Sequence, residues 1–247
     1  MLAIGVIPAR WNSSRFPGKI LEKISGKPMI EHVINRVEQS NYLKKIIIAT
    51  DNHLILEFIK SLNKSHVHSV MTNPAHLSGT DRVAEVTKEL DNDLIINIQG
   101  DEPLISPKLI DEIIIKLSEG LSDIVTAAIC THEYEEIKDP SIVKVIFDNK
   151  NTALYFSRYP IPYNRDNEKT SYWKHIGIYG YQNKFLQKLV TAKPSDAEKK
   201  EKLEQLRALH IGGKIHIIKT DKCSIGVDKP EDIKKVEKFI KENNSND

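Results

Sequence analysis

The sequence predicts an α/β fold with a mostly parallel central sheet flanked by helices. Through the first half of the 247 residues, short apolar runs alternate with segments of helical hydrophobic period. Polar loops follow the runs, as expected where parallel strands end at one edge of a sheet. In the second half, neighbouring runs alternate apolar and polar residues, which is typical of antiparallel strands. We therefore expect an antiparallel C-terminal elaboration.

The elements of the first half follow from local patterns. Met29–Ser40 is expected to be helical because its apolar residues recur at helical spacing. Thr80 is a candidate N-cap of the third helix, and Ser106 caps a fourth that begins at Pro107. The predicted strands are Ile4–Ile7, Lys45–Ala49, Val67–Met71, Leu94–Ile98 and Ile124–Ile129, and the other helices are Leu54–Leu62, Asp81–Leu90 and Pro107–Glu119.

The second half has a different texture. A polar segment with prolines, Ser157–Trp173, is too long for a tight turn and is predicted to form a mobile lid. No repeat or linker interrupts the chain, so we expect one domain over residues 1–247. The predicted strands are Val143–Phe147, Thr152–Phe156, His175–Tyr181 and Lys214–Lys219, and the predicted helices are Glu198–Leu209 and Pro230–Lys241.

Composition excludes several classes of protein. Lys and Arg number 36 against 34 Asp and Glu, and no basic block is interleaved with aromatic residues, so nucleic acid is not an expected partner. No apolar run approaches the roughly 18 residues that a membrane helix needs, so membrane insertion is not expected. The chain enters its first strand without a signal peptide, which predicts a cytoplasmic protein. Cys130 and Cys223 are expected to be reduced core thiols.

The loop after the first strand is rich in cations. Arg10, Arg15 and Lys19 occur within ten residues, together with two serines and a glycine. Ligands bind at the carboxyl edge of open α/β sheets, and these cations would offset phosphate charges there. The loop has neither the Walker A spacing nor the Gly-x-Gly-x-x-Gly spacing. A cradle for a polyphosphate is therefore predicted, with a solvated basic loop as the alternative.

Two acidic loops supply candidate metal ligands. Asp101 follows the strand in IINIQGDEP, and Asp228 lies in IGVDKPED before the last helix. Two carboxylates above a polyphosphate cradle suit Mg²⁺, which takes few protein oxygens and completes its shell with phosphate and water. The alternative for Asp228 is a cap of the final helix. Glu102 is equally suited to face water or to act as a ligand.

The loop Thr72–Arg82 is a second candidate for ligand contact. Ser78, Gly79 and Thr80 would let the backbone approach a base or ribose closely, with hydroxyls to bond it. Helix capping explains Thr80 equally well. A weaker group of polar residues in the second half would suit an anionic second substrate; its His175 is equally well explained as a structural histidine.

Nine segments taken together resemble a known family, the 3-deoxy-manno-octulosonate cytidylyltransferases, or CMP-Kdo synthetases. The resemblance covers residues 4 to about 240, in order. The only departures are Trp11, where Tyr or Phe is usual, and a short segment before His175, which leaves the fine sugar specificity open. The segments are IPARWNSSRFPGK, GKPMIEHV, ATDN, HLSGTDRVAEV, INIQGDEP, ALYFSRYPIP, HIGIYGY, LEQLR and GVDKPED.

The resemblance implies a nucleotide-diphospho-sugar-transferase-like fold, a homodimer, Mg²⁺ dependence, and the reaction of CTP with Kdo to give CMP-Kdo and pyrophosphate for lipopolysaccharide biosynthesis. Residues 1–130 would be the nucleotide-binding half and residues 131–247 the sugar-binding and dimerisation half. Arg10, Lys19, Asp101 and Asp228 would be catalytic, the two aspartates holding the metal. The nucleotide would contact Pro8, Ala9, Arg10, Ser14, Arg15, Lys19, Thr72, Ser78, Gly79, Thr80 and Asp101. The sugar acid would contact Gln99, Arg158, His175, Tyr179, Glu204 and Gln205.

A direct in-line displacement is the expected mechanism, because no residue is marked as a covalent nucleophile and positioning with charge neutralisation suffices for such transfers. Three alternatives stay open: a cytidylyltransferase for an 8-amino analogue of Kdo, one for a sialic-type acid, and a non-catalytic nucleotide-binding module.

Overall fold

The structure is a computed structural model that describes residues 2–11, 16–90, 94–166, 168, 170–222 and 225–244. The chain divides into two compact units, one formed by residues 1–111 with 223–247 and the other by residues 112–222. The C-terminal segment thus belongs to the first unit. Along the chain, the first unit gives way to the second after residue 111, whereas the two expected halves divide after residue 130. Each unit has its own strands and helices.

The first unit contains parallel strands in the order β6-β1-β4-β5. Most of their central residues are apolar and buried, which is why they occur as continuous apolar runs. The predicted strands are confirmed, with ends that differ from the predicted ones by at most two residues. They are β1 (Ala3–Ala9), β4 (Leu43–Thr50), β5 (Val67–Met71) and β6 (Leu94–Asn97).

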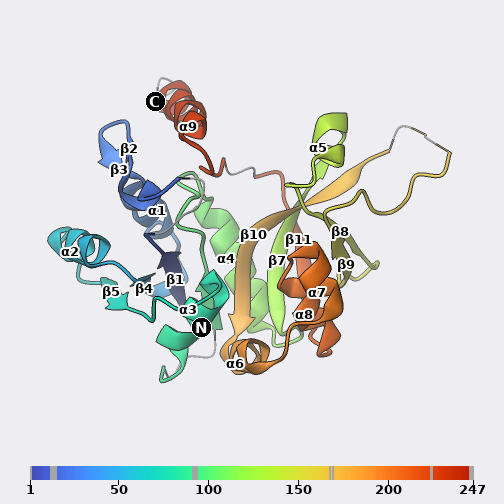
Figure 1. Ribbon diagram of the computed structural model, residues 1–247, viewed down its shortest axis with the longest axis horizontal. Helices are drawn as coiled ribbons and strands as arrows, with labels where there is room; N and C mark the ends of the chain where they lie inside the picture. Colours follow the sequence, from blue (N-terminus) through green and yellow to red (C-terminus); the bar gives the residue numbers. More distant parts are fainter. Residues whose placement is uncertain are drawn as a thin grey trace. The chain divides into compact units, whose positions relative to one another are not determined.

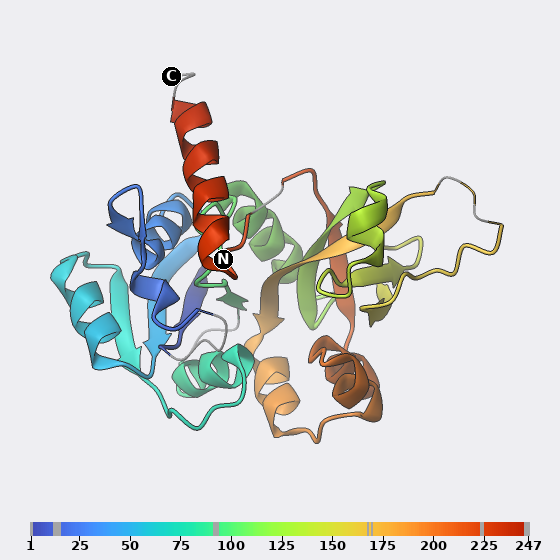
Figure 2. The same ribbon diagram turned by 45° about the horizontal axis from the view of Figure 1, so that its top comes forward.

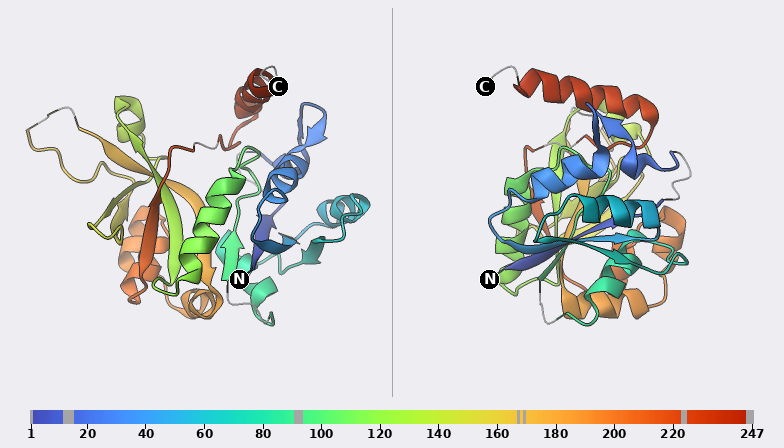
Figure 3. Two further views of the ribbon diagram at one scale, coloured as in Figure 1. Left: turned by 180° about the vertical axis from the view of Figure 1, so that it is seen from behind. Right: turned by 90° about the vertical axis from the view of Figure 1, so that its left-hand side faces the viewer.

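Helices cover both faces of these strands, as Figure 3 shows in its right-hand view. The chain moves outward from β1 to β4 to β5 and then returns to β6, so right-handed crossovers place α1 and α2 on one face and α3 on the other. The helices are α1 (Met29–Val37), α2 (His53–Ser61), α3 (Gly79–Thr87) and α9 (Pro230–Asn244), and α4 (Pro107–Ser118) leads into the second unit.

Short elements complete the first unit. The 3-10 turn η1 (Lys19–Leu21) follows the cationic loop, and a hairpin is formed by β2 (Lys23–Ile24) and β3 (Lys27–Pro28). Helix α9 packs beside this hairpin, visible in Figure 2, where the Ser25 N–H donates to the Glu237 carboxylate at 2.8 Å. The final helix therefore packs against the hairpin that follows Lys19 in the chain.

One predicted helix cap is wrong. Helix α3 begins at Gly79, and its N-cap is Ser78, whose hydroxyl accepts the N–H of Asp81 while the Asp81 carboxylate accepts the N–H of Ser78. This reciprocal capping box uses two N–H groups that Thr80 cannot reach from inside the first turn. The prediction for α4 is confirmed, because Ser106 Oγ accepts the N–H of Leu109.

The register brings the carboxyl ends of the first unit's strands to one edge. Ala9 pairs with Thr50, Thr50 pairs with Met71, and Val6 pairs with Asn97. The next residues along the chain are Arg10, Asp51, Thr72 and, one residue further on, Gln99. These polar side chains come from distant parts of the sequence and start from one edge of the sheet.

The second unit carries the predicted antiparallel strands, drawn in Figure 1. Strand β10 pairs antiparallel with β7 and β8, β8 pairs antiparallel with β9, and β11 runs parallel to β7. The strands are β7 (Ile124–Thr131), β8 (Lys144–Phe147), β9 (Ala153–Ser157), β10 (Tyr172–Gln182) and β11 (Ile215–Lys219). The helices are α5 (Tyr134–Lys138), α6 (Asn183–Thr191), α7 (Asp196–Glu201) and α8 (Gln205–His210).

Two predictions in this unit are wrong. The single helix expected at Glu198–Leu209 is two helices, because Lys202 has φ of 55° and ends α7 in the left-handed conformation. Cys130 is exposed rather than in the core, and Cys223 lies outside the described residues. Among the helices in the described part of the chain, none is long and apolar enough to cross a membrane.

Candidate functional site

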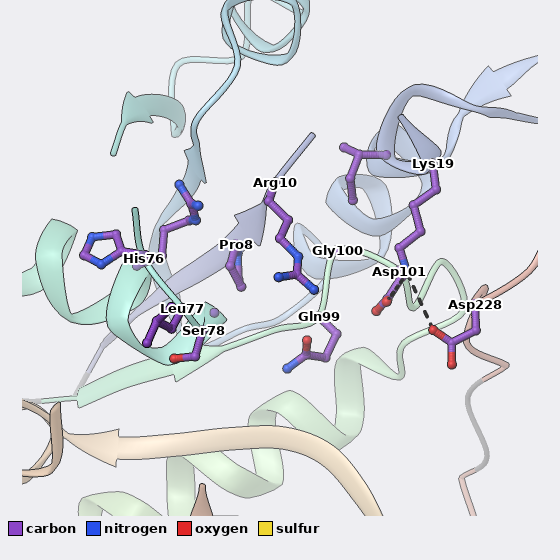
Figure 4. A pocket seen from close by; sticks show the side chains of 13 residues that line it. Pro8, Arg10, Lys19, His76, Leu77, Ser78, Gln99, Gly100, Asp101 and Asp228 are labelled. Carbon is purple, nitrogen blue, oxygen red and sulfur yellow. Dashed lines mark hydrogen bonds and ion pairs between the residues drawn. The ribbon is translucent and has the colours of Figure 1, made fainter. Parts of the chain in front are cut away.

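A cavity of about 260 Å³ opens in the first unit at the edge where the parallel strands end. Figure 4 shows Arg10 between two groups of side chains, with Lys19, Asp101 and Asp228 on one side and His76, Leu77 and Ser78 on the other. The lining residues are Pro8, Arg10, Lys19, Ile20, His76, Leu77, Ser78, Gly79, Arg82, Gln99, Gly100, Asp101 and Asp228.

One ammonium group bridges two carboxylates in this cavity. Lys19 Nζ lies 2.5 Å from Asp101 Oδ2 and 3.7 Å from Asp228 Oδ1, and it donates to the carbonyl of Val227 at 3.1 Å. The Lys19 side chain is only 11% exposed, so its charge is held in a partly desolvated place. The two aspartates that the sequence predicts as metal ligands are therefore brought to one cation.

Two glycines allow this arrangement by letting backbone segments approach closely. A Cβ on Gly100 would lie 3.1 Å from both the carbonyl oxygen of Pro8 and Ile20 Cδ1. A Cβ on Gly79 would lie 3.3 Å from Pro8 Cγ. Any side chain at either position would push the loop after β6, or the start of α3, away from the end of β1.

Asp228 lines the cavity just before the last helix. At the start of α9, the Oδ2 of Asp232 accepts the N–H groups of Asp228 at 3.1 Å and Lys229 at 3.0 Å. Those hydrogen bonds help to lower the pKa of Asp232 against the opposing effect of its burial. The backbone N–H of Val227 also donates to the carbonyl of Asp101 at 2.8 Å, which ties the two acidic loops together.

The loop between β5 and α3 forms the opposite side of the cavity. The Glu85 carboxylate accepts the N–H of Asn73 at 3.0 Å and contacts His76 Nε2 at 2.5 Å. Leu77, next in the chain, is 92% exposed at the cavity. An apolar side chain held at the rim in this way offers a surface for a flat ring.

The structure places the predicted nucleotide residues as follows. Pro8, Arg10, Lys19, Ser78, Gly79 and Asp101 line the cavity, together with Gln99, which had been expected to face the sugar acid. Ala9 and Thr80 are buried, and the Thr72 hydroxyl donates to the carbonyl of Thr50 and accepts from Arg82. Ser14 and Arg15 lie outside the described residues. Glu102 is not among the residues that line this cavity.

Five lining residues were not among the site residues predicted from the sequence: Ile20, His76, Leu77, Arg82 and Gly100. For Arg82 a signal was present, because it follows Gly79 by three positions and so lies on the same face of α3. His76 and Leu77 stand in the quoted loop but belong to residue types that usually have structural roles. Their position depends on contacts with Glu85, twelve residues after Asn73.

The residues predicted to face the sugar acid, Gln99 apart, lie in the second unit, and three of them cluster. The His175 ring lies 5.3 Å from that of Tyr179, and burial lowers the pKa of His175 to about 3. Burial also raises the pKa of Tyr179 well above its ordinary value, with further contributions from Tyr181 and from the Glu204 carboxylate. His175 is therefore neutral near pH 7 and Tyr179 keeps its proton.

A hydrogen bond orients the imidazole of His175. Its Nε2 lies 2.9 Å from Thr126 Oγ1, and that hydroxyl is also 2.7 Å from the carbonyl of Ile178. The Thr126 hydroxyl donates its one proton to the carbonyl of Ile178. Its oxygen therefore accepts the Nε2–H of His175. Nδ1 is consequently the acceptor nitrogen of the ring.

Arg158 and Gln205, the other two residues of this set, have structural surroundings. The Arg158 guanidinium donates to the carbonyls of Glu201 at 2.7 Å and Pro140 at 2.9 Å, and the backbone N–H of Arg158 donates to the Glu201 carboxylate. Glu204 is the N-cap residue of α8 and Gln205 is its first residue, buried at 7% exposure. Glu204 therefore lies just before helix α8 and Gln205 inside it, whereas the predicted helix at Glu198–Leu209 contained both.

The cavity of the first unit thus combines cations for phosphate with a carboxylate pair for a cation. Arg10, Lys19 and Arg82 supply positive charge, and Asp101 and Asp228 supply hard oxygen atoms. Close backbone approach at Gly79 and Gly100 leaves room for a ligand against the end of β1. This chemistry suits a nucleoside triphosphate with a divalent cation.

Comparison with known proteins agrees with this chemistry. The sequence profile described as "Cytidylyltransferase" matches residues 4–217. A 3-deoxy-manno-octulosonate cytidylyltransferase of Solibacter usitatus is 44% identical and aligns with 96% of this chain and 94% of its own length. An 8-amino-3,8-dideoxy-manno-octulosonate cytidylyltransferase of Shewanella baltica is also 44% identical, over 95% of this chain and 97% of its own.

Solved structures are similar over the same extent. The structure of a CMP:2-keto-3-deoxy-manno-octonic acid synthetase complexed with CTP superposes with a TM-score of 0.92 at 37% identity, covering 98% of this chain and 100% of that one. A 4-diphosphocytidyl-2C-methyl-D-erythritol synthase from Anaerococcus prevotii has a TM-score of 0.65 at 17% identity over 97% and 96% of the two chains, a likeness of fold alone.

Proposed function

Because the chain belongs to the cytidylyltransferase family, we propose that it transfers CMP from CTP to the 2-hydroxyl of 3-deoxy-D-manno-octulosonate (Kdo), releasing pyrophosphate. The observation that carries the proposal is the bridge from Lys19 to Asp101 and Asp228 in one cavity with Arg10. It provides phosphate-binding cations and a carboxylate pair at the point where a triphosphate would lie against the strand ends.

The charges in the cavity assign roles to its residues. Arg10 would bind the triphosphate through its guanidinium fork, and Lys19 would do so as a point charge from the turn that follows the loop. Ser78 and Leu77 would contact the cytidine, because they lie across the cavity from the carboxylates. A pyrimidine pocket of fixed shape rejects purines sterically and through unmet hydrogen bonds, which would favour CTP.

We propose Mg²⁺ as the cofactor, held by Asp101 and Asp228. Their fit to a cation is supported by the chain itself, since both carboxylates already lie around the Lys19 ammonium. Two hard oxygen donors leave further positions for phosphate and water, which is the usual arrangement for Mg²⁺ in nucleotide sites. When bound, Mg²⁺ would offset the charge that develops on the transferring phosphate.

The reaction would be a direct displacement. The 2-hydroxyl oxygen of the sugar acid would attack the α-phosphorus and give up its proton to water. The bond from that phosphorus to the β-phosphate oxygen would break, and pyrophosphate would leave with the negative charge. The chain contributes position and charge: Arg10 and Lys19 neutralise the phosphates and hold them in line. No covalent intermediate is needed, because one oxygen nucleophile replaces one oxygen leaving group.

The second unit would supply the sugar acid site. His175 stays neutral and presents Nδ1 as an acceptor, while the protonated Tyr179 hydroxyl beside it is a donor. A hydroxylated sugar needs such paired acceptors and donors. We propose Kdo as the acceptor and, from the relative in Shewanella baltica, the 8-amino analogue as the second candidate. The product would serve lipopolysaccharide biosynthesis in the cytoplasm.

We also propose a homodimer formed through the second unit. Tyrosines are among the residues that line a cavity of about 690 Å³ there, and Tyr134, Tyr159 and Tyr163 are 61%, 72% and 80% exposed. Exposed tyrosines gathered at one place are enriched at protein interfaces. Light scattering on the purified protein tests this; a single monomeric species at all concentrations would contradict it.

Release of pyrophosphate is the test of the proposed function. The protein would be incubated with CTP, Mg²⁺ and, in parallel, Kdo, 8-amino-Kdo and a sialic acid, with ATP, GTP and UTP as competing nucleotides. We expect rapid release with CTP and Kdo, and release at background level when the sugar acid is omitted. Equal rates with all nucleotides, or activity with sialic acid alone, would contradict the proposal.

A further inference from the structure

Asp51 contacts two separate parts of the nucleotide cavity without lining it. It follows β4 directly, and its carboxylate has one oxygen for each contact. Oδ1 accepts the backbone N–H of Trp11 at 3.0 Å, and Oδ2 accepts from Arg82 Nη2 at 2.9 Å. Trp11 is the residue after Arg10, and Arg82 itself lines the cavity. Asp51 thus links helix α3 to the start of the cationic loop.

Trp11 closes the base of that loop. Its N–H is held by Asp51, and its carbonyl accepts the N–H of Gly18 at 3.1 Å. Gly18 has φ of 72°, and a Cβ there would lie 3.4 Å from Cη2 of the Trp11 ring. Arg10 precedes this closure and Lys19 follows it. The backbone at Trp11 therefore fixes the positions from which the Arg10 and Lys19 side chains extend.

The support beneath Asp51 is buried and charged. The Arg82 side chain is 3% exposed and that of Asp51 is 13% exposed. Arg82 Nη1 also donates to the Thr72 hydroxyl, which donates in turn to the carbonyl of Thr50 at 2.9 Å. A buried ion pair that is also hydrogen-bonded to a neighbouring hydroxyl favours one geometry, so it holds its carboxylate in place.

We infer that Asp51 is a positioning residue for the nucleotide site, which aims Arg10 and Lys19 at the phosphates by fixing the N–H of Trp11 and by keeping Arg82 in place. The inference rests on the proposed function, because it needs a triphosphate in this cavity. A displacement of about 1 Å in a phosphate-binding group has large kinetic effects, so the carboxylate would influence catalysis without touching substrate.

A matched control separates positioning from stability. Asp111 is a buried carboxylate of the same unit that also holds a loop: its Oδ1 accepts the Ser40 hydroxyl at 2.5 Å and the N–H of Asn41 at 3.1 Å. Asp51→Ala and Asp111→Ala both remove a loop anchor, and both should lower the thermal unfolding midpoint. Asp51→Asn keeps an acceptor for Trp11 and tests the effect at smaller structural cost.

The experiment measures CTP binding by calorimetry and the KM for CTP beside the thermal midpoint. We expect Asp51→Ala to weaken CTP binding by about tenfold or more, since misplaced contacts act on binding and rate together. Asp51→Asn should bind CTP with an affinity between that of wild type and that of the alanine variant. Asp111→Ala should stay within about twofold of wild type, because it touches no lining residue.

Fluorescence gives a second readout: the change in Trp11 emission when CTP binds, which a merely structural role would leave as in wild type. The chain has two tryptophans, so Trp173→Phe leaves Trp11 as the sole reporter at the closure of the loop. In that background we expect CTP to change the Trp11 emission, and Asp51→Asn to change both the emission without ligand and the response to CTP.

The outcomes are distinguishable. If Asp51→Ala or Asp51→Asn loses stability like Asp111→Ala yet binds CTP within about twofold of wild type, Asp51 is a structural anchor only and the inference is overturned. If the wild-type protein itself fails to bind CTP, the proposed function fails. If Asp51→Ala does not fold, Asp51→Asn and the Trp11 emission decide the matter.

Discussion

Lys19 Nζ lies 2.5 Å from Asp101 Oδ2, although 82 residues separate them in the sequence. Lys19 follows a left-handed glycine at the start of a 3-10 turn, whereas Asp101 follows the strand β6. The ion pair joins the end of the cationic loop, at Lys19, to the acidic loop that carries Asp101. In the proposed reaction Lys19 therefore serves both parts of the site, the phosphates and the carboxylates.

Replacing Lys19 should remove nucleotide binding without unfolding the protein. Lys19→Ala leaves Asp101 without its ammonium partner and the phosphates without a cation, and truncating one partner of a partly buried charge pair costs about 2–5 kcal/mol in binding. We expect calorimetry to show CTP affinity reduced accordingly. The control is Lys27→Ala, at a lysine that is 59% exposed; wild-type turnover in Lys19→Ala would remove Lys19 from the site.

Asp228→Asn should abolish most activity with little effect on stability. The substitution keeps an oxygen but removes an anionic ligand, and the N–H groups at the start of α9 stay bonded to Asp232. We expect kcat to fall by orders of magnitude with the unfolding midpoint near that of wild type. Asp232→Ala should do the reverse, because it removes the acceptor of those two N–H groups. Near-normal Mg²⁺-dependent turnover in Asp228→Asn would show that Asp228 is not a ligand.

The stability of the protein should depend on His175 below pH 6.5. In the folded state the pKa of His175 is lowered to about 3, from 6.5 in the unfolded chain. Between these values the unfolded chain binds more protons, so His175 contributes stability that is complete above pH 6.5 and declines as the pH falls toward 3.

Urea unfolding between pH 4 and 8 measures this effect. The stability of wild type should fall more steeply with acid than that of His175→Gln, whereas His53→Gln, at an exposed position, should follow wild type. The pH profile of kcat should contain no step from His175 near its ordinary pKa. Parallel stability curves for wild type and His175→Gln would contradict the burial of a neutral imidazole.

Glu204→Gln should affect the sugar acid more than the nucleotide. After burial, the negative charge of Glu204 is one of the causes that raise the pKa of Tyr179. Both residues belong to the cluster that we assign to the acceptor sugar. We expect the KM for Kdo to rise by about tenfold or more, with the KM for CTP nearly unchanged. The control Asp196→Asn alters a carboxylate that is 90% exposed. A larger change in the KM for CTP would move Glu204 out of the sugar site.

Local patterns predicted the strands of the first unit well. β5 occupies Val67–Met71 as expected, and β1 differs from its expected range by one residue at the start and two at the end. Strand β1 is buried along nearly its whole length, so its apolar run is visible in the sequence itself. The edge on which Arg10 and Asp101 lie follows from the parallel order alone. Much of the site could therefore be located before any coordinates were known.

Predictions failed at two helix boundaries. Thr80 was expected as a cap, but Ser78, two residues earlier, forms a capping box with Asp81. The pattern of Glu198–Leu209 is helical throughout, yet the left-handed Lys202 breaks it, and Arg158 bonds to the carbonyl of Glu201 beside that break. Each local choice is worth only about 1 kcal/mol, so tertiary contacts outweigh it.

The sequence by itself determined the fold class, the edge at which the site lies, and the residue types that make it: two acidic loops and one cationic loop. The hydrophobic period and the succession of strands and helices along the chain are local properties, so they can be recognised in the sequence alone. Only the tertiary structure decided that Asp51 holds Trp11 and Arg82, that the Asp232 carboxylate accepts the N–H groups just before α9, and that the imidazole of His175 is neutral. Hydrogen bonds and burial depend on which atoms meet across tens of residues, and no local pattern records such meetings.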